Sequence, residues 1–261
     1  MDEAAVSYAG YLRLDQLLAA QQPRSGEHDE MLFIVIHQIY ELWFKQLLHE
    51  FGKLQDRLES GETTHAMRTL RRTLAILKIV VAQLDVLETM TPTQFTRFRD
   101  ALGTSSGFES AQFRELEAVL GRRDRMMVAQ YVADSPERAR IEAAMSRPSL
   151  FDSFLAYLAG QGYDVPAEVR QRDVTQPLEA SDAVQQVLKK VYDDDTDATA
   201  VCELLVDLDE GMQEWRYHHI KMVERTIGAR RGTGGSAGAS YLRTTLAQPT
   251  FPDLWAMRSL G

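Results

Sequence analysis

Residues 31–51, MLFIVIHQIYELWFKQLLHEF, decide the fold class of this chain. Large side chains recur there at intervals of three or four residues, on one face of an α-helix: Phe33, His37, Tyr40 and Phe44. The pattern continues towards Gly61, and the next proline comes only at position 92. This stretch therefore predicts a long amphipathic helix that carries a histidine on its apolar face.

Helical periodicity also dominates the rest of the chain. Thr91 followed by Pro92 is typical of a helix start, with the threonine as cap and the proline in the first turn. We expect helices over 7–21, 31–61, 64–89, 91–102, 108–121 and 198–227, with shorter ones between 122 and 180. No internal repeat, low-complexity linker or hairpin pattern interrupts them. The sequence predicts one all-α domain over 1–261, a bundle of long antiparallel helices.

Composition excludes several classes of partner. The chain has 261 residues, with 38 acidic against 29 basic side chains and a net charge of −9, which disfavours nucleic acid and anionic membranes. Cys202 is the single cysteine, so an intramolecular disulfide cannot form and a reducing compartment is expected. The N-terminus lacks a signal-peptide pattern, and no apolar run reaches the roughly 18 residues of a membrane span. These features predict a cytoplasmic protein.

A second histidine lies on an apolar helical face near the C-terminus. His219 belongs to the segment 207–228, DLDEGMQEWRYHHIKMVERTIG, whereas His218 points about 100° away around the same helix. One imidazole is a poor zinc site, since zinc takes three or four protein ligands, and the chain has no CxxCH for covalent haem. A single histidine can nevertheless hold noncovalent haem. From spacing alone, His219 is either such a ligand or a hydrogen-bonded core residue, and His37 is a second ligand, a distal hydrogen-bonding group or a core residue.

Arg99 lies four residues after Phe95 on the apolar side of its helix, while Arg97 faces elsewhere. A guanidinium on a buried face requires an anion, because an unpaired buried charge costs several kcal/mol. Its planar fork suits a carboxylate, which belongs either to an internal Asp or Glu or to a substrate.

The glycine-rich segment 232–238, GTGGSAG, follows the last long helix. It lacks the lysine of a Walker loop, and it follows a helix where a dinucleotide fingerprint would follow a strand. We interpret it either as a backbone that wraps closely over a ligand, with the Thr233 hydroxyl pointing inward, or as a surface loop.

Four long stretches, in one order along nearly the whole chain, closely resemble the tryptophan 2,3-dioxygenase family. They are YAGYLRLDQLLAAQ (8–21), HDEMLFIVIHQIYELWFKQLLHE (28–50), FRDALGTSSGFES (98–110) and EWRYHHIKMVERTIGARRGTGGSAGASYL (214–242). Motifs of this length are far more specific than either histidine alone. The resemblance implies that the bundle encloses a haem pocket.

For the cofactor, the resemblance implies haem b, held noncovalently with one iron per subunit. His219, rather than His218, would be the proximal ligand of the iron. Ser106 and Gly107 would lie beside the haem edge.

For the substrate, the resemblance implies that His37 hydrogen-bonds the indole N–H and that Phe33 lies against the ring. The substrate-binding residues would be Phe33, Ile34, Val35, Ile36, His37, Phe95, Arg99 and Thr233. Arg99 would bind the carboxylate, and Thr233 would help to hold the ammonium and carboxylate end. Phe95 departs from some bacterial members that carry tyrosine there, so no hydroxyl contact is expected. Family members are homotetramers, so residues 1–22 would pack on a neighbouring subunit, with Tyr8, Tyr11 and Leu12 acting there.

The implied reaction inserts O2 across the C2–C3 bond of the indole ring of L-tryptophan. The product would be N-formyl-L-kynurenine, the first intermediate of the kynurenine pathway. A haem monooxygenase, or a dioxygenase for a modified tryptophan in secondary metabolism, would present the same pocket residues. A noncatalytic haem sensor is a third interpretation, but it has no use for an amino-acid clamp such as Arg99.

Overall fold

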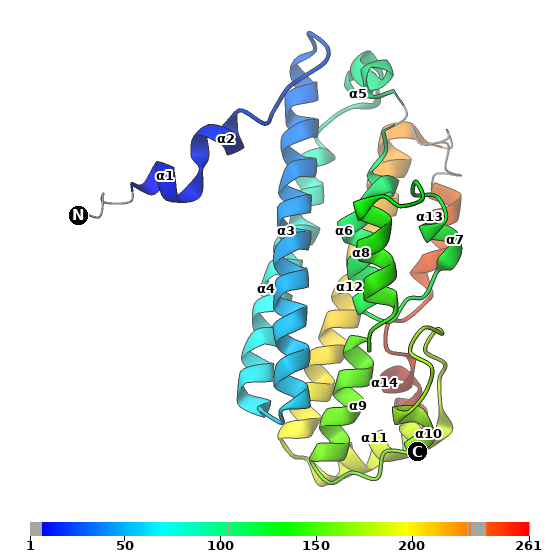
Figure 1. Cartoon of the computed structure of the whole chain (residues 1–261). Coiled ribbons are helices and arrows are strands. Elements are labelled where there is room, and N and C mark those ends of the chain that lie inside the picture. Colours follow the sequence, from blue (N-terminus) through cyan, green and yellow to red (C-terminus); the bar gives the residue numbers. More distant parts are fainter. Residues whose placement is uncertain (1–6, 104, 229, 231–238, 261) are drawn as a thin grey trace, which may run out of the picture.

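The computed structural model describes residues 7–103, 105–228, 230 and 239–260, and this part of the chain contains helices and no strand. Three long helices form its frame: α3 (His28–Glu59), α4 (Thr63–Leu87) and α12 (Asp197–Ile227). α3 and α4 form an antiparallel pair, since Gly61 adopts a left-handed conformation (φ 72°) and reverses the chain between them. α12 packs along α4 (Figure 1).

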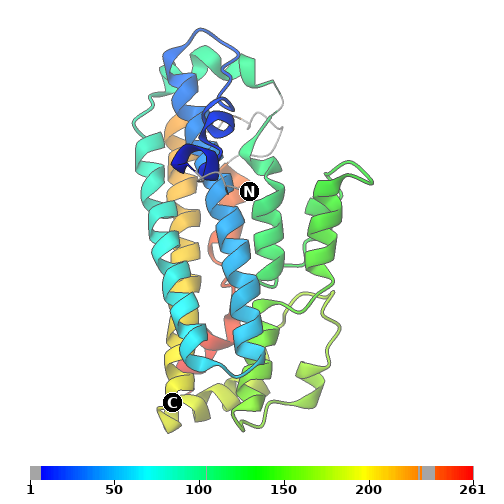
Figure 2. The ribbon, with the colours of Figure 1, turned by 60° about the vertical axis from the view of Figure 1, so that its left-hand side comes forward.

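Two shorter helices complete the bundle beside α3. α6 (Ala111–Val119) and α9 (Leu150–Gly160) both pack on α3, α6 beside its middle and α9 near its C-terminal end (Figure 1). α8 (Pro136–Met145) packs on α6 and stands at the outside of the molecule (Figure 2). The long helices therefore keep one face towards a shared interior.

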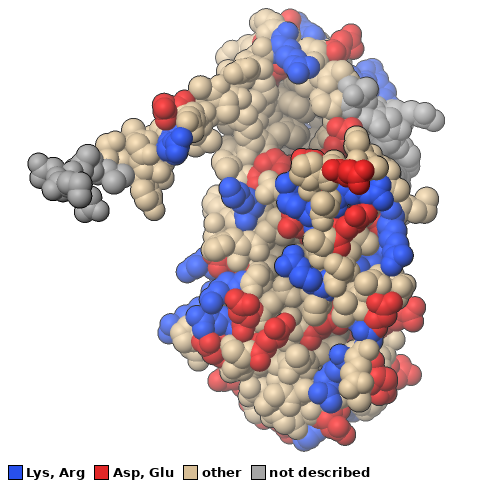
Figure 3. Space-filling view, in the orientation of Figure 1, with Lys and Arg blue, Asp and Glu red and all other residues tan. Residues whose placement is uncertain are grey.

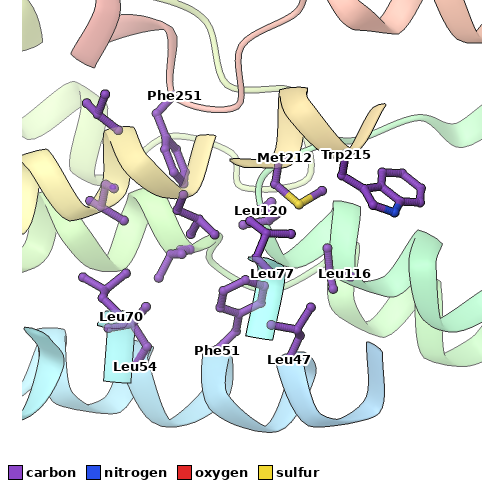
Figure 4. Packing of buried hydrophobic residues seen from close by; sticks show 14 of the residues in the cluster. Leu47, Phe51, Leu54, Leu70, Leu77, Leu116, Leu120, Met212, Trp215 and Phe251 are labelled. Carbon is purple, nitrogen blue, oxygen red and sulfur yellow. The ribbon is translucent and has the colours of Figure 1, made fainter. Parts of the chain in front are cut away.

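The apolar stripes of these helices meet in one continuous core. Figure 4 shows its central part, with side chains from α3, α4, α6, α12 and the C-terminal segment: Leu47, Phe51, Leu54, Leu70, Leu77, Leu116, Met212, Trp215 and Phe251. Gly211 permits the close approach of α12 to α4, because a Cβ there would lie 2.6 Å from Leu77 Cδ2. The core confirms the predicted all-α fold.

The N-terminal segment does not form the single helix predicted over 7–21. Arg13 adopts a left-handed conformation (φ 53°, ψ 42°), which divides the segment into α1 (Tyr8–Leu12) and α2 (Leu14–Leu18). This arm extends away from the bundle (Figure 1) and leaves Tyr8 and Tyr11 each 77% exposed. We call residues 7–19 the N-terminal arm.

The remaining elements are short. α5 (Pro92–Arg99) begins at the predicted Thr91 cap, where Thr91 and Gln94 form a capping box, and continues into η1 (Asp100–Leu102). The others are η2 (Gly107–Glu109), α7 (Arg125–Val128), α10 (Ala167–Arg170), α11 (Asp182–Asp194), α13 (Ala239–Leu246), α14 (Pro252–Ala256) and η3 (Met257–Ser259). Of these, α11, α13 and α14 were not predicted from the sequence.

A buried carboxylate fixes the C-terminal segment to the middle of α12. Asp209 accepts hydrogen bonds from Thr250 N (2.9 Å), Phe251 N (3.0 Å) and Trp255 Nε1 (2.9 Å). These donors compensate the charge of a side chain that is fully buried. The segment that follows α13 is therefore held against the helix that carries His219.

The visible surface mixes charges of both signs over the bundle (Figure 3). Among the helices in the described ranges, none combines the length and the apolar character that a membrane span requires.

Candidate active site between the long helices

A cavity of about 230 Å³ opens between α3, α5, α6, α12 and α13. Seven of the residues singled out from the sequence line it: Phe33, His37, Phe95, Arg99, Ser106, Gly107 and His219. They come from four separate parts of the chain, and the fold brings them into one space. The rest of its wall is largely apolar and aromatic, and includes Tyr40, Phe44, Leu84, Leu87, Phe113 and Trp215.

His219 projects from α12 into this cavity. Burial, reinforced by His37 and Arg114, lowers the pKa of His219 to about 4. The imidazole is therefore neutral at physiological pH, which is the form that binds a metal. Its ring lies parallel to the indole of Trp215, at 5.1 Å between centroids and 8° between planes. Trp215, one turn earlier on α12, fixes the orientation of the His219 ring by stacking.

The surroundings of His219 fit a haem better than a bare metal ion. Within the described ranges, no three His, Cys, Asp or Glu side chains come together as a metal site. One neutral imidazole in an apolar cavity is sufficient for a haem iron. Trp215 Nε1, in the wall beside it, is buried, and among the described residues it has no hydrogen-bond partner of good geometry, although the Tyr40 hydroxyl lies close enough to interact with it. A buried N–H of this kind calls for an acceptor on a bound group or a water.

His37 enters the cavity from α3 in a defined tautomer. Its Nδ1 lies 2.7 Å from the carbonyl oxygen of Phe33, and because a carbonyl can only accept, Nδ1 must carry the proton. Burial lowers the pKa of His37, so the ring is neutral and its Nε2 is left as an acceptor. The site therefore offers one imidazole nitrogen that can receive a hydrogen bond from a ligand N–H.

An aromatic group lies next to His37 and forms a wall of the cavity. The Phe33 ring lies 4.0 Å from the His37 ring, 5.9 Å from Phe95 and 5.6 Å from Phe98, measured between centroids. Tilted rings at these distances form a rigid apolar surface against which a flat aromatic ligand can pack.

Arg99 brings a fixed positive charge to the same wall. It ends α5 and is half-buried, whereas Arg97 is 62% exposed and lies 4.0 Å from Glu27. The structure thus separates the two arginines as the helical spacing predicts.

The turn over residues 106–110 forms the wall near His37. Glu109 N donates to Ser106 O (2.9 Å) and Ser110 N to Gly107 O (3.2 Å). Gly107 faces the imidazole directly, since a Cβ on it would lie 3.9 Å from His37 Nε2. The absence of a side chain at Gly107 therefore leaves space in front of the acceptor nitrogen.

Comparison with known proteins shows the family to which this chain belongs. A sequence profile described as tryptophan 2,3-dioxygenase matches residues 1–142 and 186–260. The chain belongs to the tryptophan 2,3-dioxygenase family. It is 64% identical to a tryptophan 2,3-dioxygenase of Anaeromyxobacter dehalogenans, over 98% of this chain and 96% of that protein. A protein of the same name from Herpetosiphon aurantiacus is 56% identical over 98% of both chains. One from Xanthomonas euvesicatoria is 42% identical, over 98% of this chain and 88% of that protein. The family and the enzyme class predicted from the sequence are thereby confirmed.

Some residues that the family resemblance assigns to the substrate lie elsewhere in this tryptophan 2,3-dioxygenase family member. Ile34, Val35 and Ile36 do not line the cavity, because consecutive helical residues turn by about 100° and, within 33–37, it is positions 33 and 37 that face it. Ile36 instead packs in the core. Tyr8, Tyr11 and Leu12 lie on the exposed N-terminal arm, outside the cavity lining. Thr233 lies outside the described residues.

The structure also adds residues that sequence reasoning did not single out. Glu117 on α6 is buried and accepts from Arg114 Nη1 (2.5 Å) and Arg122 Nη1 (3.1 Å), and Arg216 Nη2 lies 3.9 Å away. All four line the cavity. The three-residue spacing of Arg114 and Glu117 was the one local signal of this ion cluster.

Proposed function

We propose that this chain is a haem-dependent dioxygenase that inserts O2 across the C2–C3 bond of L-tryptophan and forms N-formyl-L-kynurenine. The observation that supports this best is the convergence of two neutral imidazoles, His37 and His219, with the guanidinium of Arg99 on one cavity. Membership of the tryptophan 2,3-dioxygenase family supports the same reaction. N-formyl-L-kynurenine would then be the first intermediate of the kynurenine pathway.

His219 would hold the cofactor, which we propose to be noncovalent haem b with one iron per subunit. When bound, the haem supplies the binding and activation of O2. The stacked Trp215 keeps the His219 ring in place. Ser106 and Gly107 would lie beside the haem, since they line the same cavity.

The remaining residues would hold L-tryptophan at both ends. His37 Nε2 accepts the hydrogen bond of the indole N–H, because Nδ1 already donates to Phe33 O. Arg99 binds the carboxylate, a contact for which its planar fork is suited, and Thr233 would assist there. Phe33 and Phe95 pack against the indole ring. Holding the ring at both ends places C2 and C3 in one position, so most of the contribution of these residues is orientation. We assign His37 this orienting role rather than that of a base.

The mass of the product tests the reaction. Reduced, haem-loaded protein is mixed with L-tryptophan and ¹⁸O-labelled O2, and the expected product is ring-opened and carries two labelled oxygens. One labelled oxygen would indicate a monooxygenase. A haem spectrum without turnover would indicate a modified tryptophan as substrate, or a sensor.

Assembly is the second part of the proposal. The N-terminal arm exposes Tyr8 and Tyr11, and such aromatic side chains are typical of a buried contact. We propose that the arm packs on a neighbouring subunit of a homotetramer in the cytoplasm, with Tyr8, Tyr11 and Leu12 next to that subunit's cavity. Light scattering of the full chain and of a variant lacking residues 1–22 tests this, since the truncation should lower the assembled mass or the tryptophan affinity.

A further inference from the structure

We propose that Glu41 and Gln112 are a positioning pair that holds the 106–110 turn against His37 and thereby sets the affinity for the substrate. This inference rests on the proposed function and adds two residues that touch neither the indole nor its carboxylate in that proposal. It starts from a contact between α3 and α6, helices whose pairing residues lie 71 positions apart.

The Gln112 amide joins the two helices with both of its N–H groups. Nε2 donates to Glu41 Oε2 (2.7 Å) and to the backbone carbonyl oxygen of Glu41 (3.0 Å). The opposite orientation of the amide would place Oε1 against two acceptors, so the geometry permits only one assignment. A hydrogen bond to a carboxylate is stronger than one between neutral groups. The pair therefore fixes the first turn of α6 on α3.

The location of the pair links it to His37 from the α3 side. Glu41 follows His37 by four residues, so both side chains lie on one face of α3 and line the cavity. The carboxylate of Glu41 also raises the pKa of His37, against the larger effect of burial. Glu41, the member of the positioning pair on α3, thus lies one helical turn from the His37 imidazole.

The other end of the pair leads directly into the 106–110 turn. Gln112 lies in the first turn of α6, whose cap Ser110 accepts from Phe113 N (3.2 Å). Ser110 N in turn donates to Gly107 O (3.2 Å), and Gly107 is the residue that faces His37 Nε2. Releasing Gln112 would free the start of α6 and let Gly107 move relative to the acceptor nitrogen.

A second anchor of the turn exists but is weaker. Tyr131 donates through its hydroxyl to Glu109 O at 3.2 Å, a neutral contact in an exposed setting. This hydrogen bond would still hold the 106–110 turn in a variant that lacks the Gln112 side chain. The expected effect is therefore a shift in the position of Gly107, with the fold and the haem cavity retained.

The test compares Gln112→Ala with a matched control. Gln46→Ala removes a bond of the same kind on α3, Gln46 Nε2 to Glu50 Oε1 at 2.7 Å, and neither of those residues lines the cavity. For Gln112→Ala we expect a KM for L-tryptophan about tenfold higher, the loss of about 1.4 kcal/mol. The haem content and kcat should stay within about threefold of the parent, and Gln46→Ala should leave KM unchanged.

A charge reversal and its rescue test the pair itself. Gln112→Glu places two carboxylates together and should raise KM at least as much as Gln112→Ala. Adding Glu41→Gln restores an amide facing a carboxylate, and it should recover at least threefold of the lost affinity. A purely structural role for Gln112 would not produce this recovery.

A readout without haem completes the experiment. Amide hydrogen exchange at Glu109 and Ser110 should become faster in haem-free Gln112→Ala and stay as in the parent in Gln46→Ala. Unchanged exchange, an unchanged KM or loss of haem from Gln112→Ala would each overturn the proposal. Failure of the parent protein itself to turn over tryptophan would instead refute the proposed function.

Discussion

Replacing Gly107 by alanine tests the role of the space in front of His37. The backbone of Gly107 lies outside the left-handed region, so alanine should be tolerated there without backbone strain. Its methyl group would lie 3.9 Å from His37 Nε2, which is ordinary van der Waals contact with the imidazole. The same methyl group would occupy part of the region through which an indole N–H must approach that nitrogen.

The expected change in tryptophan affinity follows from the one hydrogen bond that the methyl group would weaken. A neutral hydrogen bond contributes about 0.5–1.5 kcal/mol net, which corresponds to roughly 2- to 13-fold in affinity. We therefore expect Gly107→Ala to raise the dissociation constant for L-tryptophan within this range. A cofactor held by His219 should be retained, since the substitution leaves the His219 side chain on α12 unchanged.

Spectral titration of the haem-loaded protein with L-tryptophan and with its N1-methyl derivative measures the effect. The derivative has no indole N–H, so the difference in affinity between the two ligands should shrink in Gly107→Ala. Gly52→Ala is the control, because, apart from its chain neighbours and the backbone of its own helix, no atom of the described residues lies within 4 Å of a Cβ at that position. An undiminished preference for tryptophan in Gly107→Ala would refute the reasoning that this glycine leaves the approach to Nε2 open.

Three further outcomes are expected. His219→Ala should lose the haem, seen as loss of the Soret band, while His218→Ala should retain it because that side chain faces away from the cavity. Arg99→Ala should weaken tryptophan binding by about 2–5 kcal/mol, as for one partner of a buried charge pair, whereas Arg97→Ala should have little effect on KM. Burial places the folded-state pKa of His37 below its ordinary value of 6.5. At a pH between the folded-state pKa and 6.5, the unfolded chain therefore binds more protons than the folded chain. The free energy of unfolding of the haem-free protein should therefore be at its full value above pH 6.5 and decrease as the pH falls through the folded pKa. Denaturant titrations at several pH values measure this, and a decrease on raising the pH instead would contradict the assignment of a neutral buried imidazole.

The long helices could be predicted because their signal is local. The 3.6-residue period over 198–227 predicts α12 to within one residue of its observed start at Asp197. Thr91 and Pro92 mark the start of α5 in the same way. Arg13 could not be predicted, because a left-handed arginine carries none of the glycine or asparagine signal of such a position. α13 and α14 are too short to show a clear period, and their helicity depends on packing against α12.

The residues of the candidate site also separate into those that the sequence could predict and those that it could not. Helical spacing places Phe33 and His37 on one face, and the structure brings both to the cavity. The pairing of Glu41 with Gln112 leaves no trace in the sequence, because hydrogen bonds between residues 71 positions apart follow no period. The assignment of Ile34, Val35 and Ile36 to the substrate came from the family resemblance, and helical geometry turns these side chains away from the cavity.

The position of Asp209 has a consequence for how the chain is made. Its carboxylate lies in the middle of α12, but its donors Thr250, Phe251 and Trp255 come 41 to 46 positions later in the chain, so they leave the ribosome after α12 does. Until they are synthesised, the carboxylate would keep the hydrogen bond from Gln213 Nε2 (3.2 Å) on the same helix but lack these three donors, which disfavours its burial in the bundle. We therefore expect α12, the helix that carries His219, to complete its packing only after translation has passed Trp255.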